Sequence, residues 1–210
     1  MGEILQLLFP ERCVGCSGSA GLLCKQCSRE WSRPIHNRIE NIPLVSSAYY
    51  SRSISHIVLR AKENNDSRAR RVLANSIATF IESQSTIIPI PSSKSSNRRR
   101  GYDHALLLAH EVARLSESTV WNGLYVTRRV KDQTALSHAQ RFTNLSGSYA
   151  LSHSVLGNAP SQKIVLIDDL VTTGASLREA LRVLRGAEIA PKAAISACIA
   201  THHLPNTIST

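Results

Sequence analysis

The chain has 210 residues, 42% of them hydrophobic, which is enough for one α/β domain with a buried core and a small additional module. No apolar run approaches the ~20 residues that span a bilayer, and the amino-terminal MGEILQLLFPERC has no basic stretch before its short apolar run, so we expect no membrane insertion, no secretory signal and a cytoplasmic protein. The net charge of +10 favours phosphorylated ligands or nucleic acid as partners.

Four cysteines near the amino terminus form two pairs, Cys13-x-x-Cys16 and Cys24-x-x-Cys27. Four thiolates at this spacing suit a tetrahedral zinc ion, and a complete shell of cysteines leaves no ligand position for water, so the ion has a structural role. The alternatives are disulfides, which cytosolic proteins rarely keep, and a redox Cys-x-x-Cys motif, which needs only one pair. We therefore predict a zinc site.

Residues 31–43 are polar and contain two prolines, a composition that predicts a linker. We predict the first strand of the following domain at residues 44–50. Apolar residues then recur at helical spacing in residues 54–62 and 73–81, which predicts two amphipathic helices. Residues 86–91 predict an apolar strand whose two prolines limit its pairing, so we expect this strand to end at the ligand-binding edge of the sheet.

Residues 92–101 combine hydroxyl groups with cations and predict a loop directly after that strand. A solvated basic loop is one interpretation. We favour a clamp for a diphosphate, because guanidinium groups match phosphate oxygens in pairs and because ligands of open α/β sheets lie beyond the carboxyl ends of the strands. Arg100 is our candidate catalytic cation, although Lys94, Arg98 and Arg99 offer similar charge and the sequence does not distinguish them.

The elements that follow are less regular. Asp103 is placed to cap a helix, and residues 124–126 predict a short strand. Polar residues 128–144 have two interpretations, a cover that excludes water from the site and a plain connection. The eight histidines have no metal-binding spacing, so we expect them at the surface. Cys198 lies in an apolar run and is predicted to be a buried strand thiol.

The most informative stretch is KIVLIDDLVTTGASLREALRVLRG, residues 163–186. Its β-branched run at residues 164–167 predicts a strand buried on both faces of a parallel sheet, and two adjacent acids, Asp168 and Asp169, follow this run. Apolar residues at helical spacing come next, with Gly186 placed to end that helix. Between the acids and the helix lies a turn that contains five small or hydroxylated residues: Thr172, Thr173, Gly174, Ala175 and Ser176.

This order of strand, acids, turn and helix suits a sugar phosphate. Backbone N–H groups and the positive end of the helix attract the phosphate. The carboxylates of Asp168 and Asp169 can accept from vicinal ribose hydroxyls or hold a divalent cation, and two adjacent negative charges need such a partner. An ordinary β–α turn with an incidental acidic pair is the alternative. The sequence has neither Gly-Lys-Ser/Thr nor G-x-G-x-x-G here, which excludes a P-loop and a dinucleotide fingerprint.

The same stretch resembles the phosphoribosyl pyrophosphate (PRPP) signature of type I phosphoribosyltransferases, in which an apolar strand and two acids precede Thr-Thr-Gly-x-Ser/Thr. Most of the chain also resembles the ComF proteins, which are phosphoribosyltransferase-like and often linked to competence for DNA uptake. The similar blocks are residues 7–10, the four cysteines, residues 88–91, 100–102 and 133–136, Arg141 with Asn144, and residues 168–176. The family usually continues the block at 100–102 with Asn-Gln, whereas this chain has Asp103-His104, so the amide contacts of the family are not expected there.

The resemblance implies a type I phosphoribosyltransferase fold, an α/β domain with a parallel sheet flanked by helices, over residues 36–210, behind a zinc ribbon over residues 1–35. It implies a structural Zn²⁺ at the four cysteines, and Mg²⁺ together with PRPP at the acids and the turn. The expected ligand-binding residues are Asp168, Asp169, Thr172, Thr173, Gly174, Ala175 and Ser176, and the expected catalytic residues are Asp168, Asp169 and Arg100.

Two functions agree with this sequence. The first is transfer of the phosphoribosyl group from PRPP to an unidentified nitrogenous acceptor, with release of pyrophosphate. The second is PRPP binding without turnover by a protein that binds single-stranded DNA and serves the DNA-uptake machinery, through a basic face joined to the zinc module. A structural scaffold is a third hypothesis. We favour the first.

Overall fold

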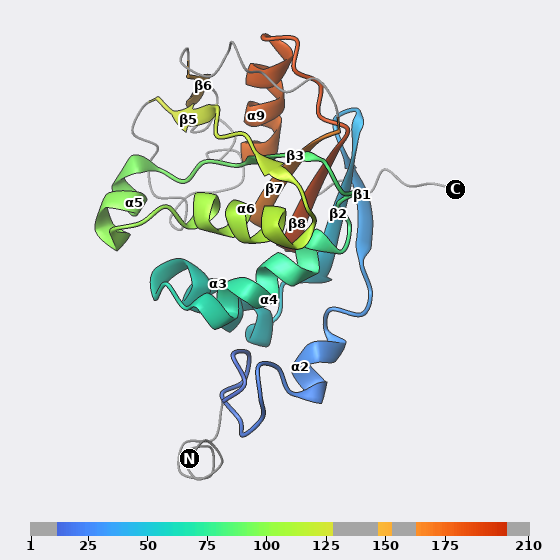
Figure 1. Cartoon of the computed structure of the whole chain (residues 1–210), viewed down its shortest axis with the longest axis vertical. Helices are drawn as coiled ribbons and strands as arrows, with labels where there is room; N and C mark the ends of the chain where they lie inside the picture. The colour runs from blue at the N-terminus through green and yellow to red at the C-terminus, as the bar shows by residue number, and fades with distance from the viewer. Residues whose placement is uncertain (1–11, 128–146, 153–162, 201–210) are drawn as a thin grey trace.

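The computed structural model describes residues 12–127, 147–152 and 163–200. The predicted cover at residues 128–144 lies outside the described residues. A six-stranded sheet has helices on both faces, and a two-stranded sheet lies beside it (Figure 1). The strands are β1 (Ile35–Ile39), β2 (Ile42–Tyr49), β3 (Thr86–Pro89), β4 (Thr119–Val120), β5 (Leu124–Val126), β6 (Tyr149–Leu151), β7 (Ile164–Val171) and β8 (Ala193–Ile199). The helices are α2 (Lys25–Arg29), α3 (Arg52–Glu63), α4 (Ser67–Ala78), α5 (Lys94–Arg100), α6 (His104–Leu115) and α9 (Ala175–Arg185). None of these described helices is long and apolar enough to cross a membrane.

The larger sheet has the strand order β1-β2-β8-β7-β3-β4. β1 runs antiparallel to β2, and the other neighbouring pairs are parallel. The connections β3–α6–β4 and β7–α9–β8 leave in opposite directions along the sheet, so right-handed crossovers place α6 and α9 on opposite faces. This architecture confirms the predicted α/β class with a mostly parallel sheet. The division of the chain between residues 35 and 36 stays a prediction.

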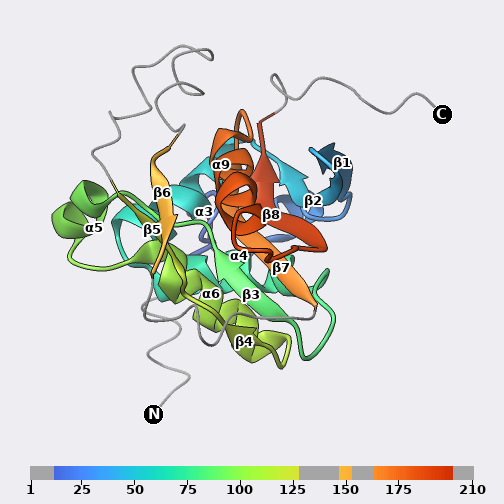
Figure 2. The ribbon, with the colours of Figure 1, turned by 90° about the horizontal axis from the view of Figure 1, so that it is seen from above.

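Side chains of β7 alternate between two hydrophobic cores. Val165 and Ile167 belong to the core that contains residues of α3, α4 and α6, whereas Ile164 and Leu166 belong to the core that contains residues of α9, β5 and β6. Figures 1 and 2 show α9 on one face of the sheet and α3, α4 and α6 on the other. Successive side chains of a strand point to opposite faces, so this strand is buried on both sides, as predicted. β7 extends to Val171, and both acids therefore lie within the strand.

The prediction of a linker at residues 31–43 is wrong for the second half of that range. Residues 35–39 form β1, which pairs with β2 through a turn at Glu40, whose φ is 49°. The polar composition belongs to an antiparallel edge hairpin, in which one face is exposed to water. Pro43 has no backbone N–H to donate. It fits in β2 because the pairing of β2 with β8 begins only at the next residue, Leu44.

The loop predicted at residues 92–101 is mostly the short helix α5. Ser93 caps this helix by accepting a hydrogen bond from the backbone N–H of Ser96, and Gly101 ends it at a φ of 78°, a left-handed geometry that favours glycine. The sequence of α5, KSSNRRR, contains no apolar residue. The helix therefore has no apolar periodicity from which it could be predicted.

We expect Leu166→Ala to lower the free energy of unfolding by about 2–5 kcal/mol, because Leu166 is fully buried and its truncation leaves a cavity in the sheet. Urea unfolding followed by circular dichroism measures this change. Leu59→Ala is the matched control, because Leu59 is 51% exposed, and it should cost less than about 1 kcal/mol. Equal losses for the two variants would contradict the packing.

Candidate ligand cavity and metal cluster

A cavity of about 740 Å³ opens at the carboxyl ends of β2, β3 and β7. It is lined by Tyr50 directly after β2, Ile90 directly after β3, and Asp168 and Asp169 near the end of β7. The strand connections change direction between β3 and β7, and open α/β sheets bind ligands at such a point. The two adjacent acids and the basic segment, by which we mean residues 92–101, thus lie around one cavity.

Asp169 is paired with a cation of the protein itself. Its side chain is 7% exposed, and Lys62 Nζ donates to its two carboxylate oxygens at 2.8 and 3.2 Å. His104 Nε2 lies 3.3 Å from Oδ2, an electrostatic contact rather than a well-formed hydrogen bond. Burial acts to raise the pKa of Asp169, but Lys62 and His104 outweigh it and hold the pKa well below its usual range. Asp169 is therefore an ionised partner of α3 and α6.

Asp168 has a different environment. Its Oδ1 accepts a hydrogen bond from the backbone N–H of Asp169 at 2.9 Å, and no described Lys, Arg or His side chain forms an ion pair with it. Burial and the neighbouring negative charge of Asp169 raise the pKa of Asp168 well above its usual value, and Lys62 opposes this shift only in part. An acid in this position is stabilised in its ionised form by a ligand that brings a metal ion or hydroxyl donors.

The turn between β7 and α9 leaves the start of the helix open. Gly174 occupies the N-cap position at a φ of 72° and supplies no side-chain cap. The hydroxyl of Thr173 accepts from the backbone N–H of Ala175 at 3.3 Å, and Arg178 Nη1 donates to the carbonyl oxygen of Thr173 at 2.7 Å. The other N–H groups of the first turn have no intrahelical partner, which suits an anion.

The structure places the predicted ligand-binding residues in two groups. Asp168, Asp169 and Ser176 line the cavity. The other four form the turn beside it without lining it: Thr172, Thr173, Gly174 and Ala175.

Arg100 is the buried cation of the basic segment. Its side chain lines the cavity and is 5% exposed, with Nε 3.3 Å from Glu63 Oε1. Nε and Nη1 have no hydrogen-bond partner among the described residues, which makes this guanidinium suited to an anionic ligand. Arg99 also lines the cavity, but its side chain is 64% exposed. Lys94 and Arg98 do not line it.

The sequence does not single out Lys62 or His104. A lysine at the end of an amphipathic helix is ordinarily solvated, and nothing local to α3 marks Lys62 as a partner of Asp169. His104 is 1% exposed, so the expectation that histidines lie at the surface is wrong for this residue. The one signal in the sequence for His104 is its place directly after Asp103, the predicted cap of α6. Asp103 caps this helix by accepting from the backbone N–H of Leu106, and it also accepts from Asn97 Nδ2.

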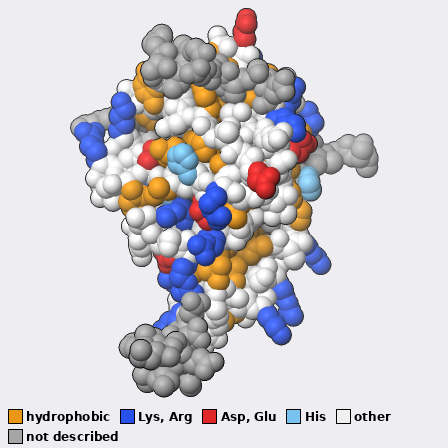
Figure 3. Space-filling view, viewed as in Figure 1, with side chains coloured by type: hydrophobic (Ala, Val, Ile, Leu, Met, Phe, Trp, Pro, Cys, Tyr) orange, Lys and Arg blue, Asp and Glu red, His pale blue; other side chains and the backbone are white. Residues whose placement is uncertain are grey.

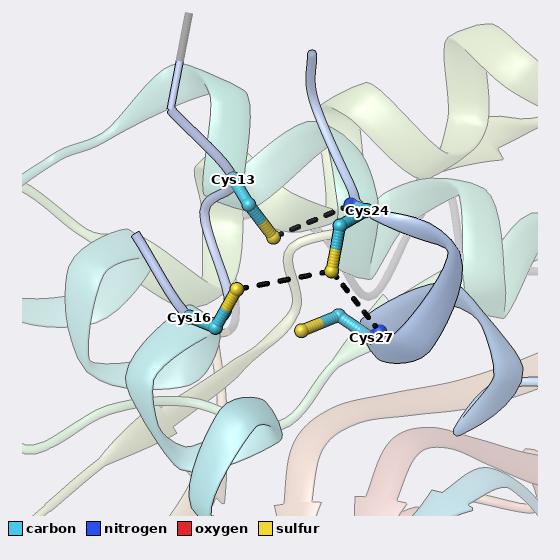
Figure 4. A group of neighbouring side chains, drawn as sticks. All are labelled: Cys13, Cys16, Cys24 and Cys27. Carbon is cyan, nitrogen blue, oxygen red and sulfur yellow. Dashed lines mark hydrogen bonds between the residues drawn. The ribbon is translucent and has the colours of Figure 1, made fainter. Parts of the chain in front are cut away.

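Cys13, Cys16, Cys24 and Cys27 point toward one another, with all four sulfur atoms within 4.8 Å (Figure 4). Cys16 Sγ and Cys24 Sγ are 3.8 Å apart, and tetrahedral coordination at Zn–S distances of about 2.3 Å also places two sulfurs about 3.8 Å apart. Burial acts to raise the pKa of Cys13, but hydrogen bonds from backbone N–H groups outweigh it and lower the pKa to about 6. The cluster therefore fits a metal ion such as zinc.

The cysteine segment packs against the start of α3. Glu30 accepts hydrogen bonds from the hydroxyls of Ser51, the N-cap of α3, and Ser53. His56 Nδ1 lies 3.1 Å from the carbonyl oxygen of Gly15. Figure 1 shows this segment beside α3 and α4, at the end of the molecule away from α9. The cluster thus supports the beginning of a helix whose other end reaches the cavity.

We expect Cys24→Ser to lower the zinc content well below that of the wild-type protein, because it removes one of four ligands and zinc binding is coupled to local folding. Elemental analysis of the purified variant measures this. Cys198→Ala is the control, because Cys198 is buried in β8 as predicted and lies outside the cluster. Full zinc occupancy in Cys24→Ser would contradict a site of four thiolates.

Known proteins are similar to much of this chain. Residues 103–205 match the family model of the phosphoribosyl transferase domain. The chain is 25% identical over 213 aligned residues to Competence protein F of Haemophilus influenzae, and the alignment covers 84% of this chain and 92% of that protein. A solved structure of the allosteric regulatory enzyme of purine biosynthesis is 20% identical, with a TM-score of 0.37. That match covers 61% of this chain and 25% of the enzyme, so the chain spans about a quarter of the enzyme's length.

Proposed function

We propose that this chain, a ComF-type protein with a phosphoribosyl transferase domain, binds PRPP in its cavity and transfers the phosphoribosyl group to a nitrogenous acceptor with release of pyrophosphate. The observation behind the proposal is that, among the described residues, one cavity contains a carboxylate in no ion pair, that of Asp168, and a buried guanidinium, that of Arg100, whose Nε and Nη1 have no hydrogen-bond partner. PRPP has the complementary groups, because its ribose hydroxyls donate to a carboxylate and its diphosphate accepts from a guanidinium.

The sugar end of PRPP binds beside the start of α9. Asp168 accepts hydrogen bonds from the ribose hydroxyls, and Ser176, near the start of α9, also lines the cavity. The helix begins at Gly174 without a side-chain cap, so its first N–H groups are available to the 5′-phosphate. The positive end of the helix dipole adds to this attraction.

The diphosphate end binds at the α5 side of the cavity. Arg100 and Arg99 both line this side, and Glu63 lies 3.3 and 3.2 Å from them. A buried guanidinium acts in a medium of low dielectric constant, where its attraction for a phosphate oxygen is much stronger than in water. Negative charge that develops on departing pyrophosphate is thereby stabilised.

Mg²⁺ fits Asp168 as its protein ligand. This ion is usually held by one or two carboxylates together with substrate phosphates, and Asp168, unlike Asp169, forms no ion pair with a cation of the described part of the chain. When bound with PRPP, Mg²⁺ neutralises charge on the diphosphate.

In the transfer, the lone pair of the acceptor nitrogen forms a bond to the anomeric carbon of PRPP. The bond from that carbon to the diphosphate oxygen breaks, its electron pair leaves with pyrophosphate, and the nitrogen loses its proton to water. The residues of the cavity hold the reacting atoms in line and stabilise the leaving group. Asp168, as an anion near the sugar, also stabilises positive charge that develops on the ribose ring.

The five cysteines support a place in the cytoplasm. All of them are free thiols, and four form the cluster suited to zinc. A reducing compartment maintains this state, whereas an oxidising one favours disulfides between neighbouring thiols.

We expect Asp168→Asn to weaken PRPP binding in the presence of Mg²⁺ at least tenfold, about 1.4 kcal/mol, because the amide no longer attracts the metal ion and accepts more weakly from the ribose hydroxyls. Isothermal titration calorimetry measures this change. Glu82→Gln is the matched control, because Glu82 is an exposed acid that does not line the cavity. Unchanged PRPP affinity in Asp168→Asn would refute the assigned site.

A second candidate function is binding of single-stranded DNA. Figure 3 shows Lys and Arg side chains gathered over α4 and toward the cysteine segment. Arg70 and Arg71 lie on α4, and Arg68 Nη2 donates to the carbonyl oxygens of Arg12 and Gly21 in that segment. The basic face and the cysteine segment are therefore joined. A similar protein is named for competence, and a basic face of this kind suits a nucleic acid backbone.

Replacing Arg70 and Arg71 together by glutamine should weaken binding of a labelled oligodeoxythymidine and lower the slope of log affinity against log salt by about 1–2, because two phosphate contacts are lost. Fluorescence anisotropy at several salt concentrations measures both. Arg185→Gln is the control, because Arg185 is an exposed arginine of α9, on the other face of the sheet. A double variant that binds like the wild type would refute this function for α4.

A further inference from the structure

The two adjacent acids of β7 have different partners. Asp169 is held by Lys62 Nζ at 2.8 Å and lies 3.3 Å from His104 Nε2. Asp168 accepts a hydrogen bond from the backbone N–H of its neighbour at 2.9 Å and forms no ion pair with a described cation. The two carboxylates therefore cannot have the same role toward a ligand in the cavity.

The alternation of side chains along β7 explains this difference. Asp169 continues the series of Val165 and Ile167, which face α3, α4 and α6. Lys62 is near the end of α3 and His104 is in the first turn of α6, so both reach Asp169. Asp168 points to the opposite side of the strand, as Leu166 does, and that side faces α9.

The cavity has a cationic wall, by which we mean Lys62, Arg99 and Arg100. Carboxylates that also line the cavity are paired with these cations, since Asp169 holds Lys62, and Glu63 lies 3.2 Å from Arg99 and 3.3 Å from Arg100. An ammonium group has three N–H donors, and two of those of Lys62 are directed to Asp169. The third is available to a ligand in the cavity that Lys62 lines.

The end of α3 is also fixed through its backbone. The carbonyl oxygen of Lys62 accepts from the hydroxyl of Tyr102 at 2.7 Å, and that hydroxyl oxygen accepts from the backbone N–H of Asn65 at 2.9 Å. Tyr102 lies in the turn between α5 and α6, so the basic segment and Lys62 are held in one arrangement. A cation that is positioned before the ligand arrives loses less entropy on binding.

A metal ion at Asp169 would conflict with this arrangement. It would have to displace Lys62 and leave that ammonium without its carboxylate partner. The nearby positive charge of Arg100 already acts to lower the pKa of Lys62, so the loss of the partner would be unfavourable. Asp168 offers a carboxylate that needs no displacement. The charges thus assign the metal and the sugar to Asp168.

We infer that Asp169 is a positioning residue that holds Lys62 as a diphosphate-binding cation on the cationic wall, while Asp168 alone meets the ribose and its metal ion. This inference rests on the proposed binding of PRPP, and it adds Lys62 to the groups that bind the substrate. It also gives the adjacent acids separate tasks.

The test is binding of inorganic pyrophosphate without Mg²⁺, measured by isothermal titration calorimetry. Lys62→Met should weaken this binding at least tenfold. Asp169→Asn should weaken it by a similar factor. The double variant should bind pyrophosphate as tightly as the single variant of lower affinity, because both changes remove the same contact. Asp168→Asn should abolish the gain in PRPP affinity that Mg²⁺ produces.

Whether Asp169→Asn weakens or strengthens pyrophosphate binding decides between a positioning role for Asp169 and the alternatives. If Asp169 acted only as a nearby negative charge or as a metal ligand, its neutralisation would leave pyrophosphate binding unchanged or strengthen it, and that result would overturn the inference. Should Asp169→Asn fail to fold, wild-type affinity in Lys62→Met would overturn it equally. Lys163→Met is the matched control, because Lys163 is exposed and does not line the cavity. A wild-type protein that binds neither PRPP nor pyrophosphate refutes the proposed function itself.

Discussion

The ion pair between Lys62 and Asp169 connects the main parts of this molecule. It links the end of α3 to the last residues of β7, and it is buried enough that removing either partner would leave an uncompensated charge. His104 adds α6 to the same contact. Since the cysteine segment fixes the other end of α3 through Glu30 and Ser51, the metal cluster and the cavity share one helix. A metal ion held by the four cysteines would therefore stabilise an element of the cavity wall while lying outside the cavity.

The second constraint is the geometry of a strand buried on both faces. In β7 the apolar residues before the acids are divided between two cores, and the acids continue that division. One carboxylate is bound by Lys62, and the other is on the side of α9, whose first turn has no side-chain cap. In the proposed complex with PRPP, a single strand supplies an anchor for the cationic wall and an acid for the sugar, because its side chains alternate.

Local patterns made much of this predictable. β7, its turn and α9 follow from a β-branched run and helical spacing, and the cysteine cluster follows from the spacing of its pairs, since each depends on residues close in sequence. α5 and β1 were not predictable in this way, because neither has enough apolar residues to reveal its period. The contact of Lys62 with Asp169 joins residues 107 positions apart. Only the tertiary fold reveals such a pair, and the same is true of the buried position of His104.

A crystal structure of the protein with PRPP and Mg²⁺ tests the account most directly. We predict the ribose hydroxyls against Asp168 and the diphosphate against Lys62 and Arg100, with the contact between Lys62 and Asp169 intact. A cavity without PRPP at saturating concentration would contradict the account. So would a metal ion bound to Asp169 with Lys62 turned away, because the two acids would then share one role.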